Sequence, residues 1–351
     1  MITYVLPLRC SGCSDGAHDE LAAYLCGLAD RATVIVADGS PWREFARHGR
    51  VFGPSMRHLR LDPDVAGFAN GKVAGVTTGV RAAPTERVVV ADDDVRYTAA
   101  SLDAVVAALD DADLVVPQNV FPRERQPWHA RWDGARSLVN RAIGTDFPGT
   151  LAIRRSAFLT AGGVYAGDVL FENLELMRTI AASGGRVAVR RDLAVVRLPP
   201  TVRRFWEQRV RQAYDEFARP GRMIVFLAIA PGLVAVSRRA RWAPAAAAAA
   251  AIALAEIGRR RDGGTEMFPL ATPLFAPLWV TERAVCSWLA LGSRVVRGGV
   301  DYRGRVLRRS ATPMRRLRDP HEPAPRRASR RRAAWSASAR TGTAARSHAG
   351  S

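Results

Sequence analysis

Three adjacent carboxylates, Asp92, Asp93 and Asp94, follow directly after the apolar run Arg87–Ala91. Neighbouring negative charges repel one another unless a cation or solvent relieves them. Oxygen ligands suit Mg2+ or Mn2+, which bind through one or two carboxylates and complete their shell with phosphate oxygens and water. We therefore predict that Asp92 and Asp94 bind a divalent metal ion. The alternative is a solvated turn with helix-capping aspartates.

Short apolar runs alternate with helical patterns on both sides of this triplet. The runs predict strands at 2–6, 33–37, 87–91, 113–117 and 150–153, and the patterns predict helices at 15–28, 70–80, 99–109, 128–143, 172–183 and 203–217. Such alternation predicts an α/β fold with a doubly wound, mostly parallel sheet. In an open sheet of this kind the ligand lies outside the carboxyl ends of the strands, where Arg9, Asp38 and the acidic triplet stand.

Composition excludes several classes of protein. With 351 residues, 48% hydrophobic and 24% charged, and a mean hydropathy of -0.07, the chain is neither wholly disordered nor a many-span membrane protein. The net charge of +19 falls on residues 201–351, since the first 200 residues are close to neutral. The pI near 11.2 therefore does not predict that the folded part binds nucleic acid. Anionic membrane lipid is the expected partner of the basic part.

The C-terminal part contains apolar segments at 223–237, 242–258 and 268–291, each short or interrupted by charge. A helix that crosses a bilayer needs about 20 apolar residues. We expect a membrane-embedded hairpin or interfacial helices with snorkelling arginines, in preference to an Ala-rich soluble helical cap. The predicted divisions are a catalytic domain at 1–219, a membrane-associated region at 220–309 and a disordered basic tail at 310–351.

The cysteines and histidines give little support for a metal or redox site. Cys10 and Cys13 form a single Cys-x-x-Cys, whereas zinc takes four ligands. Four cysteines without a signal peptide do not form a secreted disulfide framework, so we expect the chain to begin on the reducing side of a membrane. Four histidines show no metal-ligand spacing and are expected at the surface: His18, His48, His58 and His129.

Seven segments, taken in order, resemble motifs of the family 2 glycosyltransferases with the GT-A fold, in the ceramide glucosyltransferase-like branch. The segment around the acidic triplet resembles the Asp-x-Asp motif of that branch. Residues 34–40 resemble the first aspartate motif, and 70–72 resemble the segment before the nucleotide-facing helix. Residues 147–150 with 162–163 resemble the acceptor-side motif, and 171–175 resemble the Glu-Asp motif. Residues 208–212 resemble Gln-x-x-Arg-Trp, and 298–305 resemble a juxtamembrane ending. The likeness covers about residues 1–309.

The resemblance implies an inverting, metal-dependent hexosyltransferase. Its donor would be a nucleotide sugar, and its acceptor a lipid or glycan hydroxyl at the cytoplasmic face of the cell membrane. Mn2+ or Mg2+ would be held by Asp92 and Asp94. The donor would be bound by Asp38, Lys72, Asp93, Gln208 and Arg211. For Gln208 and Arg211 a solvated amphipathic helix is the alternative.

Inverting transfer also needs a general base for the acceptor hydroxyl. The family supplies an aspartate at the position of Asn173, and an amide cannot take a proton at neutral pH. Glu172 is our first candidate for the catalytic base, followed by Asp168 and Glu175. A charge favoured by the N-terminus of a helix is the alternative for Glu172.

Two other functions remain open at the level of sequence. A nucleotidyltransferase shares a metal-binding sheet and nucleotide substrates, but it ordinarily has a Gly-rich basic loop after the first strand, where 9–13 offers one Arg and one Gly. The second alternative is a non-catalytic protein that binds membrane or nucleic acid through its arginines, with a degenerate glycosyltransferase core. Asn173 keeps this alternative open.

Overall fold

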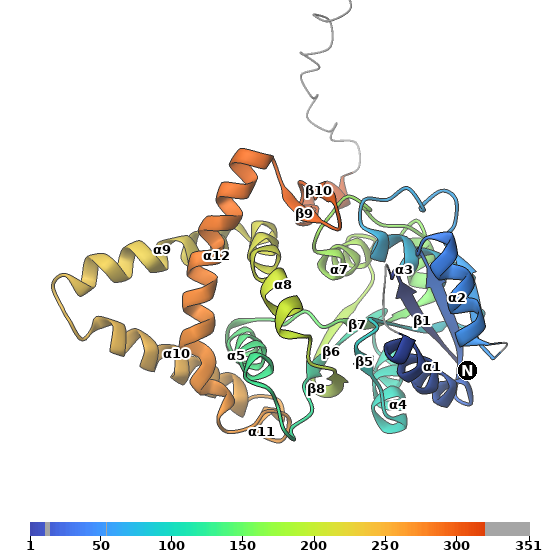
Figure 1. Ribbon diagram of the computed structural model, residues 1–351, viewed down its shortest axis with the longest axis horizontal. Helices are drawn as coiled ribbons and strands as arrows, with labels where there is room; N and C mark the ends of the chain where they lie inside the picture. The colour runs from blue at the N-terminus through green and yellow to red at the C-terminus, as the bar shows by residue number, and fades with distance from the viewer. Residues whose placement is uncertain (11–14, 54, 320–351) are drawn as a thin grey trace, which may run out of the picture.

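The computed structural model describes residues 1–10, 15–53 and 55–319, so that Cys13 of the Cys-x-x-Cys pair and residues 320–351 of the expected tail lie outside it. At its centre is an eight-stranded sheet in the order β3-β2-β1-β4-β7-β6-β8-β5 (Figure 1). The strands are β1 (Ile2–Leu8), β2 (Ala32–Asp38), β3 (Arg57–Arg60), β4 (Arg87–Ala91), β5 (Val95–Arg96), β6 (Leu114–Val120), β7 (Thr150–Arg154) and β8 (Val187–Arg197).

The sheet is mostly parallel, as predicted. Strands β3, β2, β1 and β4 run parallel to one another, and β8 runs parallel to β6. Strand β7 is antiparallel to both β4 and β6, and the short β5 is antiparallel to the end of β8. The reversal brings Thr150, at the start of β7, beside Ala91 at the end of β4. The segment before β7 therefore lies next to the acidic triplet.

Alternating side chains bury both faces of the sheet. In β1, Tyr4 and Leu6 belong to one buried cluster and Val5 to the other, which is the two-residue period of a strand. The first cluster is covered by α1 (Asp15–Ala29), α2 (Trp42–Phe52) and α4 (Ala99–Ala107), with η1 (Ala108–Asp110) after it. The second is covered by α3 (Gly71–Ala82), α6 (Arg155–Thr160) and α7 (Glu172–Ala182). The predicted α/β doubly wound arrangement is thus confirmed.

A second layer of helices packs beside the sheet and carries its own apolar clusters. It contains α5 (Trp128–Ile143), α8 (Val202–Tyr214), η2 (Asp215–Ala218), α9 (Pro220–Ser237), α10 (Ala243–Arg260), α11 (Gly264–Met267), η3 (Thr272–Phe275) and α12 (Ala276–Arg297). Arg209 of α8 is 2% exposed and pairs with Asp133 of α5 at 2.8 Å and with Glu282 of α12 at 3.5 Å. These buried pairs attach α12 to the helices that continue the sheet domain.

Helices α9 and α10 form a hairpin that extends away from the rest of the protein (Figure 1). Within the described residues, α9 is the one helix long and apolar enough to cross a membrane, and 11% of it is buried. Large apolar side chains on the hairpin are more than half exposed, among them Ile224, Val225, Val234, Val236 and Trp242. The predicted segments are therefore helices, whereas their membrane association remains a prediction.

Residues 300–319 form a hairpin and a short helix that pack against the rest of the described chain. Strands β9 (Val300–Tyr302) and β10 (Arg305–Leu307) form a small hairpin, followed by α13 (Met314–Arg318), which packs on α7. The Phe171 amide donates to the Ser310 carbonyl at 2.8 Å, and the Thr312 amide donates to the Glu175 carboxylate at 2.6 Å. Residues 310–319, at the start of the predicted tail, therefore contact α7 and the residue before it through backbone atoms, which the sequence pattern does not reveal. The division at 310 stays a prediction.

The close contact between α10 and α5 yields a test of the packing. A Cβ at Gly258 would lie 1.9 Å from the Leu138 carbonyl oxygen, whereas a Cβ at Gly232 of α9 meets no atom within 4 Å. We expect Gly258→Ala to force α10 away from α5 and to lower the free energy of unfolding by about 1–3 kcal/mol. Gly232→Ala, the matched control, should raise it by up to about 1 kcal/mol. Equal denaturation midpoints for the two variants would contradict this packing.

Candidate functional site

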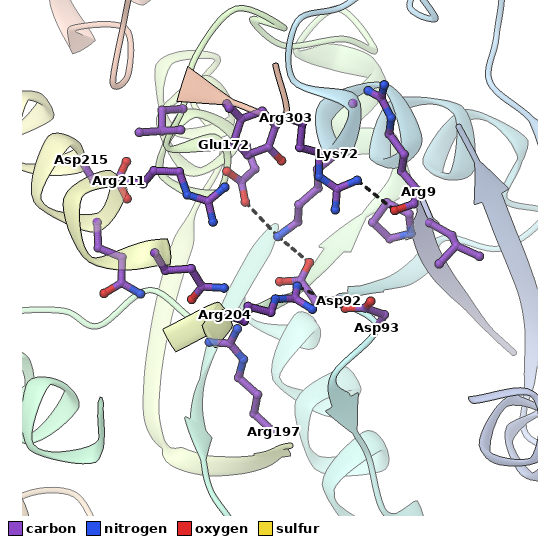
Figure 2. A pocket seen from close by; sticks show the side chains of 17 residues that line it. Arg9, Lys72, Asp92, Asp93, Glu172, Arg197, Arg204, Arg211, Asp215 and Arg303 are labelled. Carbon is purple, nitrogen blue, oxygen red and sulfur yellow. Dashed lines mark hydrogen bonds and ion pairs between the residues drawn. The ribbon is translucent and has the colours of Figure 1, made fainter. Parts of the chain in front are cut away.

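Lys72 stands between two carboxylates that come from different elements (Figure 2). Its Nζ lies 2.6 Å from Asp92 Oδ1, at the end of β4, and 2.9 Å from Glu172 Oε1, in the first turn of α7. Burial alone would lower the pKa of Lys72, but Asp92 and Glu172 outweigh it and raise that pKa above its ordinary value. Lys72 is therefore a permanent cation that joins β4, α3 and α7 at one point.

The helix cap before Lys72 fixes its position. The Asn70 side chain accepts a hydrogen bond from the Lys72 amide at 3.0 Å, which is the usual cap at the start of a helix. The same side chain donates to the Val169 carbonyl at 2.9 Å, and the Asn70 amide donates to the Gly167 carbonyl. Asn70 thus ties the start of α3 to the segment that leads into α7, and so sets the span between Asp92 and Glu172.

Gly149 allows the chain to pass close to Asp92. The Asp92 amide donates to the Gly149 carbonyl at 2.9 Å, and a Cβ at position 149 would lie 2.7 Å from Asp92 Oδ2. Burial raises the pKa of Asp92 to about 6, against the opposing effect of Lys72. A side chain at 149 would block the free oxygen of this carboxylate, which explains the small residue in the predicted acceptor-side segment.

Asp94 has one oxygen bound and one without a partner. Both Nε and Nη2 of Arg197, at the end of β8, lie 2.9 Å from Asp94 Oδ2. Burial would raise the pKa of Asp94, but Arg197 outweighs it and lowers that pKa. Asp94 Oδ1 is buried and has no hydrogen-bond partner among the described residues. A buried carboxylate oxygen without a partner fits a hard divalent cation.

A first chamber of about 220 Å³ opens on one side of Lys72 (Figure 2). It lies at the carboxyl ends of β1 and β4, as expected for an open sheet. The Arg303 side chain closes its rim by donating to the Arg9 carbonyl at 2.9 Å. Its basic side chains, which outnumber its acidic ones, are Arg9, Lys72, Arg197, Arg204, Arg211 and Arg303.

A second chamber of about 160 Å³ opens on the other side of Lys72. The two chambers share six lining residues: Lys72, Asp92, Glu172, Arg197, Gln212 and Asp215. The second chamber is also lined by the 147–149 segment, by Asn173 and by residues of α5, η2 and α12. The Lys72 cluster therefore forms the boundary between two adjacent compartments.

Four of the five residues predicted to bind the donor line the first chamber. Lys72, Asp93, Gln208 and Arg211 do so, and the Arg211 guanidinium also lies 5.4 Å from the Tyr302 ring. Arg204 Nη2 is 3.9 Å from Asp93 Oδ1, so that α8 faces the acidic triplet. Whether these residues bind a nucleotide sugar remains a prediction.

Asp38 lies outside both chambers. It is fully buried, and Oδ2 is 2.6 Å from His48 Nδ1 and 3.0 Å from His58 Nε2. Burial alone would raise the pKa of Asp38, but hydrogen bonds from His58, Ser40 and His48 lower it to about 2. In this structure Asp38 holds α2 and β3 against the end of β2, and has no surface open to a nucleoside. The expectation that His48 lies at the surface is wrong, as it is for His18 and His129.

The candidate bases lie in different places. Glu172 lines both chambers. Asp168 has a side chain that is 62% exposed and pairs with Arg309, outside the chambers, while Glu175 is fully buried and accepts from the Thr312 amide. Asn173 lines the second chamber and donates to the Pro148 carbonyl at 2.6 Å. Of the three proposed carboxylates, Glu172 is thus the one that the structure places in the site.

Several lining residues were missed by sequence reasoning. Arg197 ends β8, a strand that was not predicted because Arg190, Arg191 and Asp192 interrupt its apolar run. Arg303 stands in a turn of the β9–β10 hairpin, within the segment expected beside the membrane. Asp215 follows α8, and Arg283 lies in an apolar segment where Glu282 and Arg283 were interpreted as interruptions. No local pattern marks the last two as parts of a site.

No family model matches the sequence, and no curated protein matches it. The mannosyltransferase PcManGT from Pyrobaculum calidifontis, solved with GDP-Man and Mn2+, is similar over 82% of this chain and 86% of that one, at 18% identity and a TM-score of 0.47. Mannosyl-3-phosphoglycerate synthase from Rubrobacter xylanophilus is similar over 60% of this chain and 70% of that one, at 16% identity and a TM-score of 0.39. Glucosyl-3-phosphoglycerate synthase from Mycobacterium tuberculosis is similar over 58% of this chain and 74% of that one, at 15% identity and a TM-score of 0.40. These values are too low to assign an activity.

Proposed function

We propose that the chain is a metal-dependent inverting glycosyltransferase. It would move a hexosyl group from a nucleotide-sugar donor to a hydroxyl of a lipid or glycan acceptor. The observation that carries the proposal is the boundary between the two chambers, where the acidic tip of β4, Lys72 and Glu172 meet. A transferase of this kind needs charge stabilisation for the leaving group on one side and a base for the acceptor on the other.

Asp92 and Asp94 would hold Mn2+ or Mg2+ through their free oxygens. The ion, when bound, neutralises charge that develops on the departing diphosphate. Lys72 and Arg197 already balance one oxygen of each carboxylate, which leaves the second oxygen of each as a candidate ligand. Asp92 lines both chambers, whereas Asp94 lines neither. The negative charges of the two carboxylates are thus balanced by Lys72, by Arg197 and, when it is bound, by the metal ion.

The first chamber fits the donor. Its arginines come from β1, α8, β8 and the β9–β10 hairpin, and they surround the acidic triplet. Guanidinium groups bind phosphate oxygens through paired N–H donors. Arg9, Arg204, Arg211 and Arg303 would therefore bind the diphosphate from several directions, with Gln208 beside them.

Glu172 would accept the proton of the acceptor hydroxyl. It lines the second chamber as well as the first, and it lies 2.9 Å from Lys72. In the transfer, the bond from the anomeric carbon to the diphosphate oxygen breaks, and its electron pair leaves with the diphosphate. A new bond forms from the acceptor oxygen to the same carbon, and the hydroxyl proton passes to Glu172. Asn173 instead holds the Pro148 carbonyl, so its amide would shape the acceptor side.

A matched pair of isosteric variants separates donor binding from transfer. We expect Asp94→Asn to weaken Mn2+-dependent binding of GDP or UDP at least about 100-fold, because it removes the charge that the metal requires. Glu172→Gln should leave that binding within about threefold and lower the transfer rate about 100- to 10,000-fold. Calorimetry in Mn2+, in Mg2+ and in chelator, with turnover over a panel of nucleotide sugars, measures both.

Asp103→Asn is the control, since its side chain is 59% exposed, pairs with Arg31 and lines neither chamber. Equal nucleotide affinity in Mn2+ and in chelator would contradict the metal assignment. Undiminished turnover in Glu172→Gln would place the base elsewhere. Turnover that releases diphosphate and joins a nucleotide to the product would favour the nucleotidyltransferase alternative.

We further infer that the hairpin of α9 and α10 attaches the protein to the cytoplasmic face of the cell membrane. Large apolar side chains on it are more than half exposed, and Arg238, Arg239 and Arg241 stand at its tip. Apolar faces with flanking arginines suit the boundary between headgroups and acyl chains of anionic lipid. A groove of about 1030 Å³ between α8 and α12, lined partly by Trp288, Leu289 and Val296, shares residues of α8 with the first chamber and adds to the apolar surface on this side of the protein.

The membrane proposal predicts that charge on the hairpin prevents binding. Val225→Glu and Val236→Glu should each lower partition onto anionic vesicles about tenfold, since a buried valine side chain contributes roughly 1.5–3 kcal/mol. Leu159→Glu, on the exposed surface of α6, is the control and should have no effect. Sedimentation with vesicles measures the partition. Unchanged partition in both hairpin variants would contradict the proposal.

A further inference from the structure

The second chamber has an excess of buried N–H donors. Nε and Nη1 of Arg283 and Nε1 of Trp279 are buried and lack an acceptor in the described part of the chain. Both side chains come from α12, and they are 2% and 1% exposed. The Arg283 guanidinium lies 5.7 Å from the Trp279 ring, so the two stand together at one wall of the chamber.

Among the described residues that line this chamber, Arg283 is the basic side chain without an ion pair. Lys72 pairs with Asp92 and Glu172, and Arg197 with Asp94. The other two arginines pair as well: Arg136 with Asp146 and Arg219 with Glu216. Among the described residues, Arg283 has no hydrogen bond and no ion pair. A buried charge without a partner is strongly destabilising, so its presence needs a compensating anion.

Burial lowers the pKa of Arg283, and the charges of Glu282 and Glu216 oppose that effect, but neither carboxylate lies within ion-pair distance of it. Glu282 pairs with Arg209 instead. Asp92, Glu172 and Glu216 are engaged by Lys72, Arg219 and Arg222. Asp215 has a buried oxygen without a partner, and burial, with the charges of Glu172 and Glu216, raises its pKa well above the ordinary value. Burial thus disfavours the charged form of Asp215, and no ion pair joins Asp215 to Arg283 in the described part of the chain.

We propose that the second chamber binds a phosphate-type oxyanion carried by the acceptor, with Arg283 and Trp279 as its main donors. This inference rests on the proposed function, in which the second chamber is the acceptor side. A tetrahedral oxyanion accepts hydrogen bonds from several directions, which suits guanidinium and indole donors that line one small cavity. With its anionic group held there, the acceptor would present a neighbouring hydroxyl to Glu172 at the boundary of the chambers.

The test compares two buried arginines that differ in their partners. Arg283→Met should leave the melting temperature of the free protein unchanged or raise it, because it removes an uncompensated charge. Arg209→Met should lower it, since Asp133 and Glu282 would lose their partner. Inorganic phosphate, added with Mn2+ and GDP or UDP at saturation to fill the first chamber, should raise the melting temperature of the wild type. That shift should be lost in Arg283→Met, with affinity for phosphate reduced at least tenfold.

Arg260→Gln, whose side chain is 74% exposed, is the control and should keep the full response to phosphate. A melting temperature of Arg283→Met as low as that of Arg209→Met would show a structural role for Arg283 and overturn the proposal. An undiminished phosphate response in Arg283→Met would overturn it as well. Nucleotide binding without any phosphate response in the wild type would refute this inference alone. Absence of metal-dependent nucleotide binding would refute the proposed function instead.

Two further ligands identify the source of the oxyanion. Glycerol phosphate represents a soluble acceptor, and phosphatidylcholine vesicles with or without phosphatidic acid represent a lipid headgroup. An Arg283-dependent response to glycerol phosphate supports the proposal with a soluble acceptor. A response to phosphatidic acid alone, also lost in Arg283→Met, supports it with a lipid acceptor. If neither ligand gives an Arg283-dependent response, the proposal is wrong.

Discussion

The ion pairs of Lys72 with Asp92 and Glu172 are the interaction on which the site depends. They join the end of a central strand to the first turns of two helices, at the edge of the sheet where parallel strands place their ligands. The acidic tip of β4 would repel itself without Lys72 and Arg197. Each of these cations engages one carboxylate oxygen and leaves another free, so the same contacts stabilise the fold and define the candidate metal ligands.

Two C-terminal elements, α12 and the β9–β10 hairpin, complete the site. Arg303 closes the first chamber, while Trp279 and Arg283 form a wall of the second. Helix α12 therefore contacts both the site and the exposed α9–α10 hairpin. This arrangement gives a physical reason for apolar segments and catalytic residues to share one folded unit: attachment to a bilayer through the hairpin would hold the chambers near the headgroups.

Periodicity predicted the helices and strands that are strongly patterned, including α5 at its full length and β4, which ends at the acidic triplet. It missed β8, because charged residues break the apolar pattern of that strand. It also missed α2, whose buried side includes a polar residue, His48, that contacts Asp38 in the core. The position of Asp38 after a strand suggested a ligand, but contacts between distant segments decide whether such a residue is open. Arg283 could not be found from sequence, because its significance lies in the lack of a partner, which only the packed structure reveals.

The central claim is that free oxygens of Asp92 and Asp94 bind a divalent ion beside the first chamber. The most direct measurement is an anomalous difference map from crystals of the full chain grown with Mn2+ and GDP or UDP. The account predicts one strong peak within coordination distance of both carboxylates, in contact with the diphosphate, and with Lys72 still bound to Asp92 or Glu172. A peak at Asp38, His48 and His58 instead, or a bound nucleotide with no peak near Asp94, would contradict it.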